Sequence, residues 1–256
     1  ELVFNNGIDP KTKLHIGPKT GLPEELQSFD DFYRAYILQL SHIIEADISV
    51  CNEFECFLNQ LNPANVFSAA VQNSLLTAKD AFHDGCFYNN TTLLNAGFAS
   101  TVDALCAVRE MVYLKKEVTL AGFKEILDAN WSNHEKFRLK ILKDCPHYGN
   151  GNPVADHYAG MLGRFLSTKI NGRPNSRGGL WKASIHSARQ FIELGKKTGA
   201  TPDGRFAGEE MSKNSSPVMG MDRSGVTALI RSAAVLDAGD FPADLPLDVM
   251  LHPTAV

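Results

Sequence analysis

The sequence predicts an α/β fold, and two observations carry that prediction. Apolar side chains recur at spacings of three and four residues along most of the 256 residues, which is the pattern of amphipathic helices. Short runs typical of single strands separate these helical stretches, at residues 88–95, 180–194 and 247–251. Lone strands that alternate with helices argue for an α/β fold.

The first third of the chain is predicted to be mainly helical. Residues 1–7 are typical of the last turn of a helix, closed by a glycine cap at Gly7. A loop rich in proline and glycine follows at residues 8–27. Ser28 then caps a long helix, whose apolar pattern could continue as far as Leu61 before Pro63 breaks it. Residues 66–78 are apolar but short, so both a strand and a helix stay open there.

The middle of the chain is predicted to be a strand followed by several helices. Gly97 and Ser100 follow the strand at 88–95 and open a helix through Tyr113. Thr119 caps the next helix, and Asn133 starts another that ends before residue 146.

The last hundred residues are predicted to alternate again. Pro153 lies in the first turn of a helix that runs to Ile170, and residues 171–179 form a loop. A strand follows at 180–194, then a helix that Ser224 or Gly225 opens and that continues through Leu236. The strand at 247–251 is the last element. Because no finishing turn follows it, and residues 1–7 lack the start of their helix, we expect the chain to be a fragment of a longer protein.

The loop at residues 195–210, with the sequence GKKTGATPDGRFAGEE, joins the two parts of the last hundred residues. Pro202, Asp203 and Gly204 form a turn, because proline fixes φ, aspartate bonds back to the backbone and glycine accepts a positive φ. We expect Asp203 and Arg205 to fix this loop by a charge-assisted hydrogen bond rather than to contact a substrate.

The composition excludes several kinds of partner. A hydrophobic content of 44% and a charged content of 21% are ordinary for a globular domain. The net charge of −4 without a basic cluster argues against nucleic acid and an anionic membrane surface, and no apolar run is long enough to span a bilayer. Five cysteines without a C-x-x-C pair indicate free thiols in a reducing cytoplasm. The histidines and cysteines lack the spacing of metal ligands, so we expect no metal site.

Six segments, in the same order, resemble motifs of one enzyme family. They are Asp84–Asn89 (DGCFYN), Gly97–Leu105 (GFASTVDAL), Tyr148–Asn150 (YGN), Thr201–Glu209 (TPDGRFAGE), Ser215–Ala228 (SSPVMGMDRSGVTA) and Leu251–Pro253 (LHP). Together they resemble the glycyl radical enzymes, the pyruvate formate-lyase-like family, over nearly the whole chain.

The resemblance implies a fold and a chemistry. It implies a ten-stranded β/α barrel built from two five-stranded halves, of which residues 1–256 would supply most of the second half. The family cleaves C–C, C–O, C–N or C–S bonds of small substrates, with formate acetyltransferase as the reference activity and dehydratases, lyases and decarboxylases as other branches. The run from Ser215 to Ala228 looks more like the dehydratase and lyase branch.

The resemblance also places both radical centres outside this chain. The family's cysteine loop lies upstream of the segment that matches residues 1–7, and its glycyl radical loop lies downstream of the segment at 251–253. No residue here is therefore given a catalytic role, and no cofactor is expected to be bound to this chain. A radical S-adenosylmethionine activating enzyme would install the radical on a glycine outside it, and the enzyme is expected to be a cytoplasmic homodimer.

By position in the family, six residues are candidates to line the substrate pocket. They are His186, Ser187 and Gln190 on the strand at 180–194, Asn89 on the strand at 88–95, and Ser216 and Pro217 after the loop at 195–210. The alternative for each polar candidate is a side chain that is satisfied by neighbouring backbone groups. For Pro217 the alternative is a simple turn former.

Two other functions stay open. The chain by itself could be a non-catalytic domain that binds or assembles, because it lacks both radical centres. Cys86, where the family usually has a small residue, could pair with His83 as the nucleophile of a thiol hydrolase, although an inert thiol is the alternative. In the second case, replacing Cys86 with alanine would abolish the activity.

Overall fold

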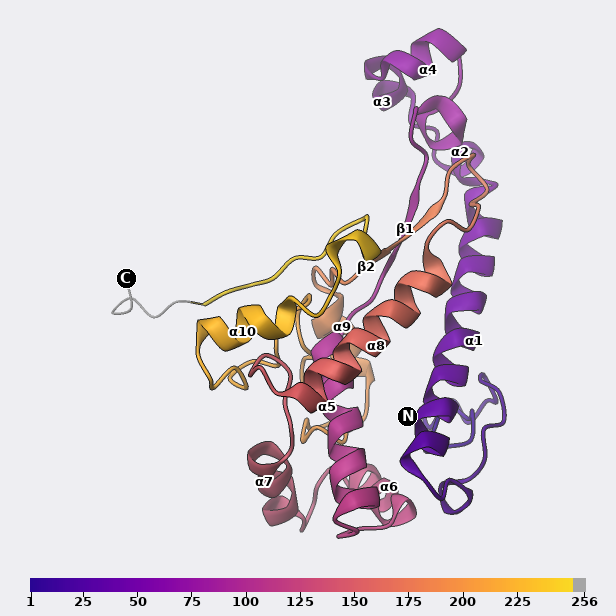
Figure 1. Ribbon diagram of the computed structural model, residues 1–256. Coiled ribbons are helices and arrows are strands. Elements are labelled where there is room, and N and C mark those ends of the chain that lie inside the picture. The colour runs from indigo at the N-terminus through magenta and orange to yellow at the C-terminus, as the bar shows by residue number, and fades with distance from the viewer. Residues whose placement is uncertain (251–256) are drawn as a thin grey trace.

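The computed structural model describes residues 1–250, which form an elongated molecule of helices around a small parallel sheet (Figure 1). The helices are α1 (Phe29–Glu55), α2 (Leu58–Leu61), α3 (Asn65–Ala70), α4 (Gln72–Thr77), α5 (Phe98–Val108), α6 (Leu120–Asp128), α7 (Glu135–Asp144), α8 (Pro153–Ile170), α9 (Gln190–Lys197) and α10 (Val226–Ala233), and the strands are β1 (Thr91–Leu94) and β2 (Trp181–Ser184). The mixture of helices and strands agrees with the prediction. The segment at 251–253 lies outside the described residues.

The two strands are parallel. Thr91 pairs with Trp181 and Leu94 with Ser184. A third segment joins the other edge of β2, where Ser184 forms a parallel bridge with Asp244 and the Ile185 N–H donates to the Asp244 carbonyl at 3.1 Å. Residues 243–245 therefore extend the sheet without forming a regular strand.

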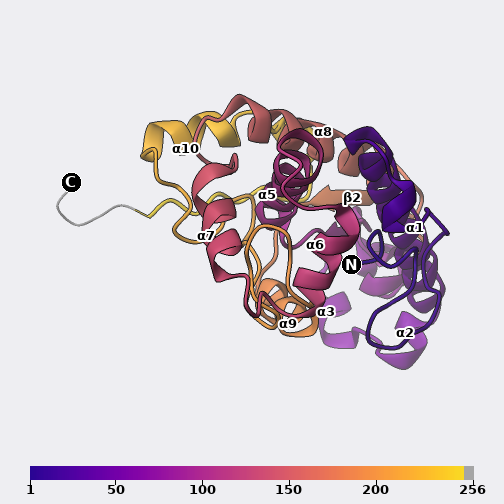
Figure 2. The ribbon, with the colours of Figure 1, turned by 90° about the horizontal axis from the view of Figure 1, so that it is seen from below.

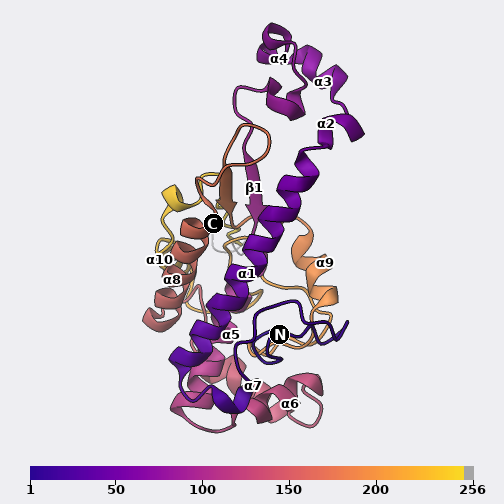
Figure 3. The same cartoon turned by 90° about the vertical axis from the view of Figure 1, so that its right-hand side faces the viewer.

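Helices cover one face of this sheet. Leu93 of β1 and Trp181 and Ala183 of β2 are buried in a core cluster with residues of α1, α5 and α8. A second cluster joins the first half of α1 to the end of α5, α6 and α7, and Phe123 and Trp131 lie at its centre. Figure 3 shows α6 and α7 at the lower end of the molecule, and Figure 2, seen from below, shows α8 beside α1.

The long strand predicted at 180–194 is wrong. The strand ends at Ser184, Ala188 takes a positive φ of 39°, and α9 begins at Gln190. The sequence QFIELGKK contains several good helix formers, and Lys196 and Glu193 form an ion pair one helical turn apart at 3.1 Å. An apolar run of this length did not distinguish a strand from a short strand followed by a helix.

Most predicted helix starts are confirmed. The Ser28 side chain accepts a hydrogen bond from the Asp31 N–H, and the Thr119 side chain accepts one from the Gly122 N–H. Pro153 occupies the first turn of α8, which ends at Ile170 as predicted. The helix expected to start at Asn133 starts one residue after His134 instead, because Asn133 itself has a φ of +63°.

The turn at residues 1–7 has the hydrogen bonds of a helix end. The Gly7 N–H donates to the Leu2 carbonyl at 2.8 Å, and the Asn6 N–H donates to the Val3 carbonyl at 3.4 Å. These are the two bonds of a Schellman motif. Gly7 has a φ of +81°, but Asn6 at +49° takes the capping position that the prediction assigned to the glycine.

Residues 57–88 protrude beyond the end of α1. The stretch at 66–78, for which the sequence left strand and helix open, forms α3 and α4 (Figure 3). The predicted long helix is interrupted at Cys56, and only the short α2 follows it. Several large apolar side chains of the protrusion are exposed, among them Val66 at 89% and Leu76 at 77%. At the other end of the chain, the described residues 247–250 form no strand, contrary to the prediction.

Candidate functional site

The loop at 195–210 is organised by one buried arginine. The Arg205 guanidinium donates from Nη1 to the carbonyls of Phe206 at 3.0 Å and Glu209 at 2.7 Å, and from Nη2 to the Gly199 carbonyl. Its Nε donates to Thr201 Oγ1 at 3.1 Å. These charge-assisted bonds tie both ends of the loop together, so Arg205 has the loop-fixing role that the sequence predicts.

Asp203 is the second buried charge of this loop. Its side chain is 5% exposed and accepts a hydrogen bond from the Thr201 hydroxyl. Burial raises the pKa of Asp203 to about 6, and the nearby carboxylate of Asp103 adds to the shift, while the Thr201 bond and Arg205 oppose it. The carboxyl group therefore binds its proton more tightly in the folded protein than in the unfolded chain.

This shift predicts how stability depends on pH. Because the pKa of Asp203 rises from 3.8 to about 6 on folding, the free energy of unfolding should fall as pH increases between these values, by up to about 3 kcal/mol. Asp203→Asn should remove this part of the slope. Urea denaturation of both proteins at pH 4, 5, 6 and 7 measures it. Parallel pH profiles for the two proteins would contradict the prediction.

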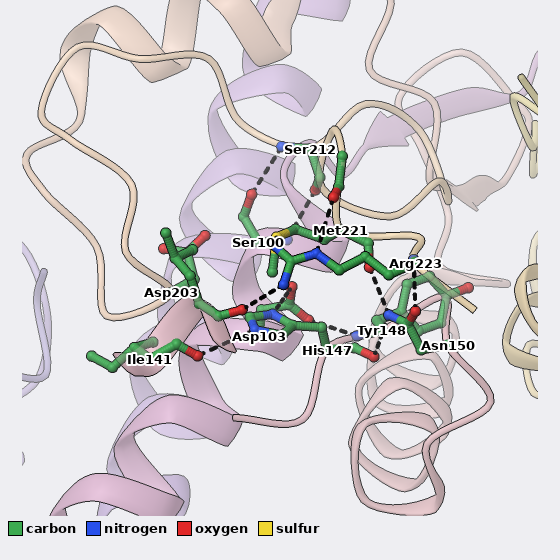
Figure 4. Close-up of polar contacts among 12 residues, drawn as sticks. Ser100, Asp103, Ile141, His147, Tyr148, Asn150, Asp203, Ser212, Met221 and Arg223 are labelled. Carbon is green, nitrogen blue, oxygen red and sulfur yellow. Dashed lines mark hydrogen bonds and ion pairs between the residues drawn. The ribbon is translucent and has the colours of Figure 1, made fainter. Parts of the chain in front are cut away.

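A buried ion pair lies beside this loop (Figure 4). His147 Nδ1 is 2.9 Å from Asp103 Oδ2, and the Tyr148 N–H donates to Asp103 Oδ1 at 2.8 Å. His147 Nε2 lies 3.3 Å from the Ile141 carbonyl, so both ring nitrogens face acceptors and the protonated imidazolium satisfies both. Burial lowers the pKa of His147, but the hydrogen bond and the charge of Asp103 outweigh it and raise the pKa overall.

The YGN motif joins the ion pair to the segment after the loop. Asn150 Nδ2 donates to the Met221 carbonyl at 2.7 Å, and its Oδ1 accepts from the N–H groups of Arg223 and Ser224. Ser100 and Ser212 exchange two backbone-to-hydroxyl bonds, at 3.0 and 2.9 Å (Figure 4). Hydrogen bonds thus join three of the motifs quoted from the sequence, at residues 97–105, 148–150 and 215–228.

Pro217 belongs to this scaffold. A Cβ added to Gly149, whose φ is +93°, would lie 2.2 Å from Pro217 Cγ. The backbone of the YGN motif therefore lies directly against the proline ring, which supports a packing role for this candidate.

Ser187 and Ser216 meet in a second network at the carboxyl end of β2. Asn214, with a φ of +54°, donates from its N–H to Ser187 Oγ at 2.9 Å and from Nδ2 to Asp248 Oδ2 at 2.8 Å. The Asp248 N–H donates to Ser216 Oγ at 2.8 Å. Ser187 is fully buried. The two serines are therefore brought together, and their partners are backbone groups and neighbouring side chains.

His186 lies at the same end of β2 but is half exposed. Its Nδ1 is 3.1 Å from Asp244 Oδ1, and its N–H donates to Ser184 Oγ at 2.9 Å. Gln190 begins α9 and is exposed rather than part of a strand.

Asn89 is separated from the other candidates. It precedes β1, whereas His186 and Ser187 follow β2, and the strands are parallel, so they lie at opposite ends of the sheet. Asn89 is buried, its Nδ2 donates to the Cys86 carbonyl at 2.7 Å, and Asn175 donates to its carbonyl. The backbone thus satisfies its amide nitrogen, whereas its buried Oδ1 has no hydrogen-bond partner among residues 1–250.

Arg177 and Glu55 lie beside Asn89 and were not singled out by the sequence. Arg177 Nε is 3.2 Å from Glu55 Oε1, and both side chains are largely buried. The Thr91 hydroxyl donates to Glu55 Oε1 at 2.7 Å, and Arg177 Nη2 donates to the Asn90 carbonyl at 3.0 Å. This cluster joins the end of α1 to the amino ends of both strands.

Over residues 1–250, no hydrogen bond joins Cys86 to His83, and no group of three His, Cys, Asp or Glu side chains is placed to hold a metal ion. The helices of these residues include none with the length and apolar character needed to cross a membrane.

Comparison with known proteins places this scaffold in a family. The sequence profile described as "Pyruvate formate lyase-like" matches residues 1–195. The trans-4-hydroxy-L-proline dehydratase of Clostridioides difficile is 30% identical over 237 residues, which is 93% of this chain and 30% of that enzyme. The (2S)-3-sulfopropanediol dehydratase of Klebsiella oxytoca is 28% identical over 93% of this chain and 29% of its own length.

Comparison with solved structures leads to the same family. The B12-independent glycerol dehydratase from Clostridium butyricum, in its glycerol-bound form, superimposes with a TM-score of 0.88 at 29% identity, over 96% of this chain and 31% of the enzyme. The chain therefore spans about a third of the length of the relatives it matches. The matched profile, the identity to these enzymes and the shared fold together show that the chain belongs to the pyruvate formate-lyase-like family of glycyl radical enzymes.

Proposed function

We propose that this chain forms one wall of the substrate-containing barrel of a glycyl radical enzyme of the dehydratase and lyase branch. The observation that carries the proposal is the likeness to the glycerol dehydratase over 96% of this chain, together with the two dehydratases of similar sequence. In a complete enzyme the barrel would have ten strands, and its cysteine and glycyl radical loops would come from the rest of the polypeptide.

The arrangement of the sheet supports this role. One face of β1 and β2 packs against helices, and the other face carries Thr92 and Leu94, which are exposed. In a closed barrel the helix-free face lines the interior. The polar groups after β2 lie at the carboxyl end of the strand, the end at which β/α barrels place their chemistry. His186 is the candidate that this arrangement favours most.

The experiment that tests the function starts from the native polypeptide. Intact mass and peptide mapping establish whether it contains a G-C-x-E loop before Glu1 and an R-V-x-G-Y loop after Val256. The protein is then incubated anaerobically with a radical S-adenosylmethionine activating enzyme and examined by electron paramagnetic resonance. We expect a glycyl doublet, and turnover of diol or hydroxy amino acid substrates.

The same experiments test the assignment to the dehydratase branch, and they distinguish an enzyme from a non-catalytic domain. Cleavage of pyruvate with coenzyme A, without dehydration of any diol, would overturn the dehydratase assignment. A native polypeptide that lacks both loops and shows no radical would overturn the catalytic role and leave a binding or assembly domain.

Residues 1–256 produced alone should self-associate. The edge of β1 away from β2 has no strand partner among residues 1–250, and the protrusion at 57–88 exposes large apolar side chains such as Val66 and Leu76. Light scattering coupled to size-exclusion chromatography should therefore show oligomers or aggregates. A monodisperse monomer with a sharp thermal transition would contradict this expectation.

A further inference from the structure

A small cavity of about 160 Å³ opens next to the buried ion pair of Asp103 and His147. Three parts of the chain form it: the end of α7, the YGN motif with the start of α8, and the segment that follows the loop at 195–210. Its polar lining includes Lys143, His147, Asn150, Asn152 and Arg223, of which His147, Asn150 and Arg223 are drawn in Figure 4. No residue of β1 or β2 lines the cavity, nor does any of the six candidates for the substrate pocket.

The charged groups that line this cavity are all cationic. Lys143 and Arg223 form no ion pair among residues 1–250. Asp144 and Asp222, their acidic neighbours along the chain, are exposed and do not line the cavity. Two unpaired positive charges from different elements therefore meet at one hollow in the surface.

The guanidinium of Arg223 also has hydrogen-bond donors to spare. Nη1 donates to the Leu142 carbonyl at 3.1 Å, and Nε donates to the Gly220 carbonyl at 3.4 Å. Nη2 meets only the Met221 sulfur, a weak acceptor, at 3.2 Å. Since a guanidinium carries five N–H groups, its two outer nitrogens keep donors that no strong acceptor of residues 1–250 uses. The carbonyls hold the fork in place, and its remaining donors suit an oxyanion.

The positive charges lie close enough to repel each other. Burial lowers the pKa of His147, the hydrogen bond and charge of Asp103 outweigh it, and the charge of Arg223 opposes them. A cation has this effect because it disfavours a second positive charge nearby. Asn152 caps α8 at the positive end of the helix dipole, which adds a field of the same sign. An anion in the cavity would reduce the repulsion and interact favourably with the dipole.

We propose that this cavity binds a phosphate group, held by the guanidinium of Arg223 and the ammonium of Lys143. A tetrahedral anion with two negative charges can contact cations on two different elements, and the small volume suits such a group better than a larger metabolite. The bound anion would join α7 to the segment at 215–228, which the YGN motif already holds. The inference does not depend on the proposed function, because the cavity lies apart from the sheet.

Phosphorus NMR titrations of the native, full-length polypeptide, before any radical activation, test the proposal. The probes are inorganic phosphate and methyl phosphate, with chloride at the same ionic strength as the reference. Arg223→Met and Lys143→Met each remove one of the two cations. The matched control is Lys136→Met, which removes an exposed lysine of α7 that does not line the cavity. Thermal melts check that each variant is folded.

The expected result is a loss of affinity confined to the cavity variants. Arg223→Met should weaken phosphate binding about tenfold or more, the equivalent of one charge-assisted hydrogen bond. Lys143→Met should weaken it less, because a flexible ammonium group is a point charge without the arginine fork. Lys136→Met should match the wild type. Phosphate should also raise the melting temperature of the wild type above that in chloride, since a ligand stabilises the folded state that it binds.

The two probes distinguish the source of the phosphate group. Similar affinity for methyl phosphate and inorganic phosphate would show that the cavity takes the phosphate of a small ester. Binding of inorganic phosphate alone would show that the free anion is the ligand.

The proposal fails if the wild type binds neither probe. It also fails if folded Arg223→Met and Lys143→Met bind phosphate like the wild type, which would indicate an adventitious ion only. Should Arg223→Met not fold, Lys143→Met decides the question, because its exposed side chain can be replaced without disturbing the core. Unchanged affinity in that variant would overturn the assignment.

Equal losses in Lys143→Met and Lys136→Met would also overturn it, because they would show a general effect of surface charge.

Discussion

Arg177→Met should destabilise the native protein by about 3–5 kcal/mol, because it leaves the Glu55 carboxylate buried without its partner. Glu55 is 8% exposed, and its Oε1 is held by Arg177 Nε at 3.2 Å and the Thr91 hydroxyl at 2.7 Å. Methionine fills much of the arginine volume, so the loss of stability measures the effect of the unpaired Glu55 charge rather than that of a cavity. Urea denaturation at pH 7 of wild type and variant measures it.

The matched control removes both charges. In Glu55→Gln combined with Arg177→Met, no uncompensated charge stays buried, and the Thr91 hydroxyl can still donate to the amide oxygen. We expect the double variant to recover more than half of the stability that the single variant loses. If the double variant were as unstable as Arg177→Met, the lost bonds to the strand ends, and not the buried charge, would explain the effect.

Gly149→Ala should have an effect of similar size for a steric reason. The added methyl group would meet Pro217 Cγ at 2.2 Å, and the φ of +93° strains any residue with a side chain. Left-handed strain of about 1–2 kcal/mol and overpacking of about 1–3 kcal/mol give an expected loss of about 2–5 kcal/mol. Thermal and urea unfolding of the native polypeptide measure it.

Gly172→Ala separates the two causes. Gly172 has a φ of +78°, and a Cβ added there would meet no atom within 4 Å. This variant should therefore lose only about 1–2 kcal/mol, the cost of the backbone strain. Equal losses at the two positions would show that the proline contact is not tight and that Pro217 does not lock the YGN motif in place.

Local signals predicted the starts of elements well. Ser28, Thr119 and Pro153 each mark a helix start, because a cap or a first-turn proline depends only on residues within one turn. The prediction of a strand over 180–194 was wrong because the end of this strand does not depend on nearby residues alone. Where it ends depends on the partner segment at residue 244, and the local apolar pattern also suits α9.

In the candidate site, too, contacts between residues near in the sequence could be predicted, and contacts between distant residues could not. Arg205 could be given its loop-fixing role because its partners lie within six residues of it. Asp103 and His147 are 44 residues apart in the sequence. Glu55 is buried against Arg177, which belongs to another part of the chain. Neither pair could therefore be predicted from the spacing of residues in the sequence. Asp244 likewise reaches His186 only through the sheet, and the sequence reveals the histidine but not its partner.

The parallel pairing of β1 and β2 has a consequence for how the chain folds. The bond from the Leu180 N–H to the Asn90 side chain joins residues 90 positions apart at the start of the two strands. Closing a loop of that length costs about 4 kcal/mol in chain entropy before the sheet contributes any stability. The helices between the strands, α5 and α8 above all, must therefore pack first and shorten the effective loop. The wall that carries the candidate site is thus expected to be the last part of the chain to form.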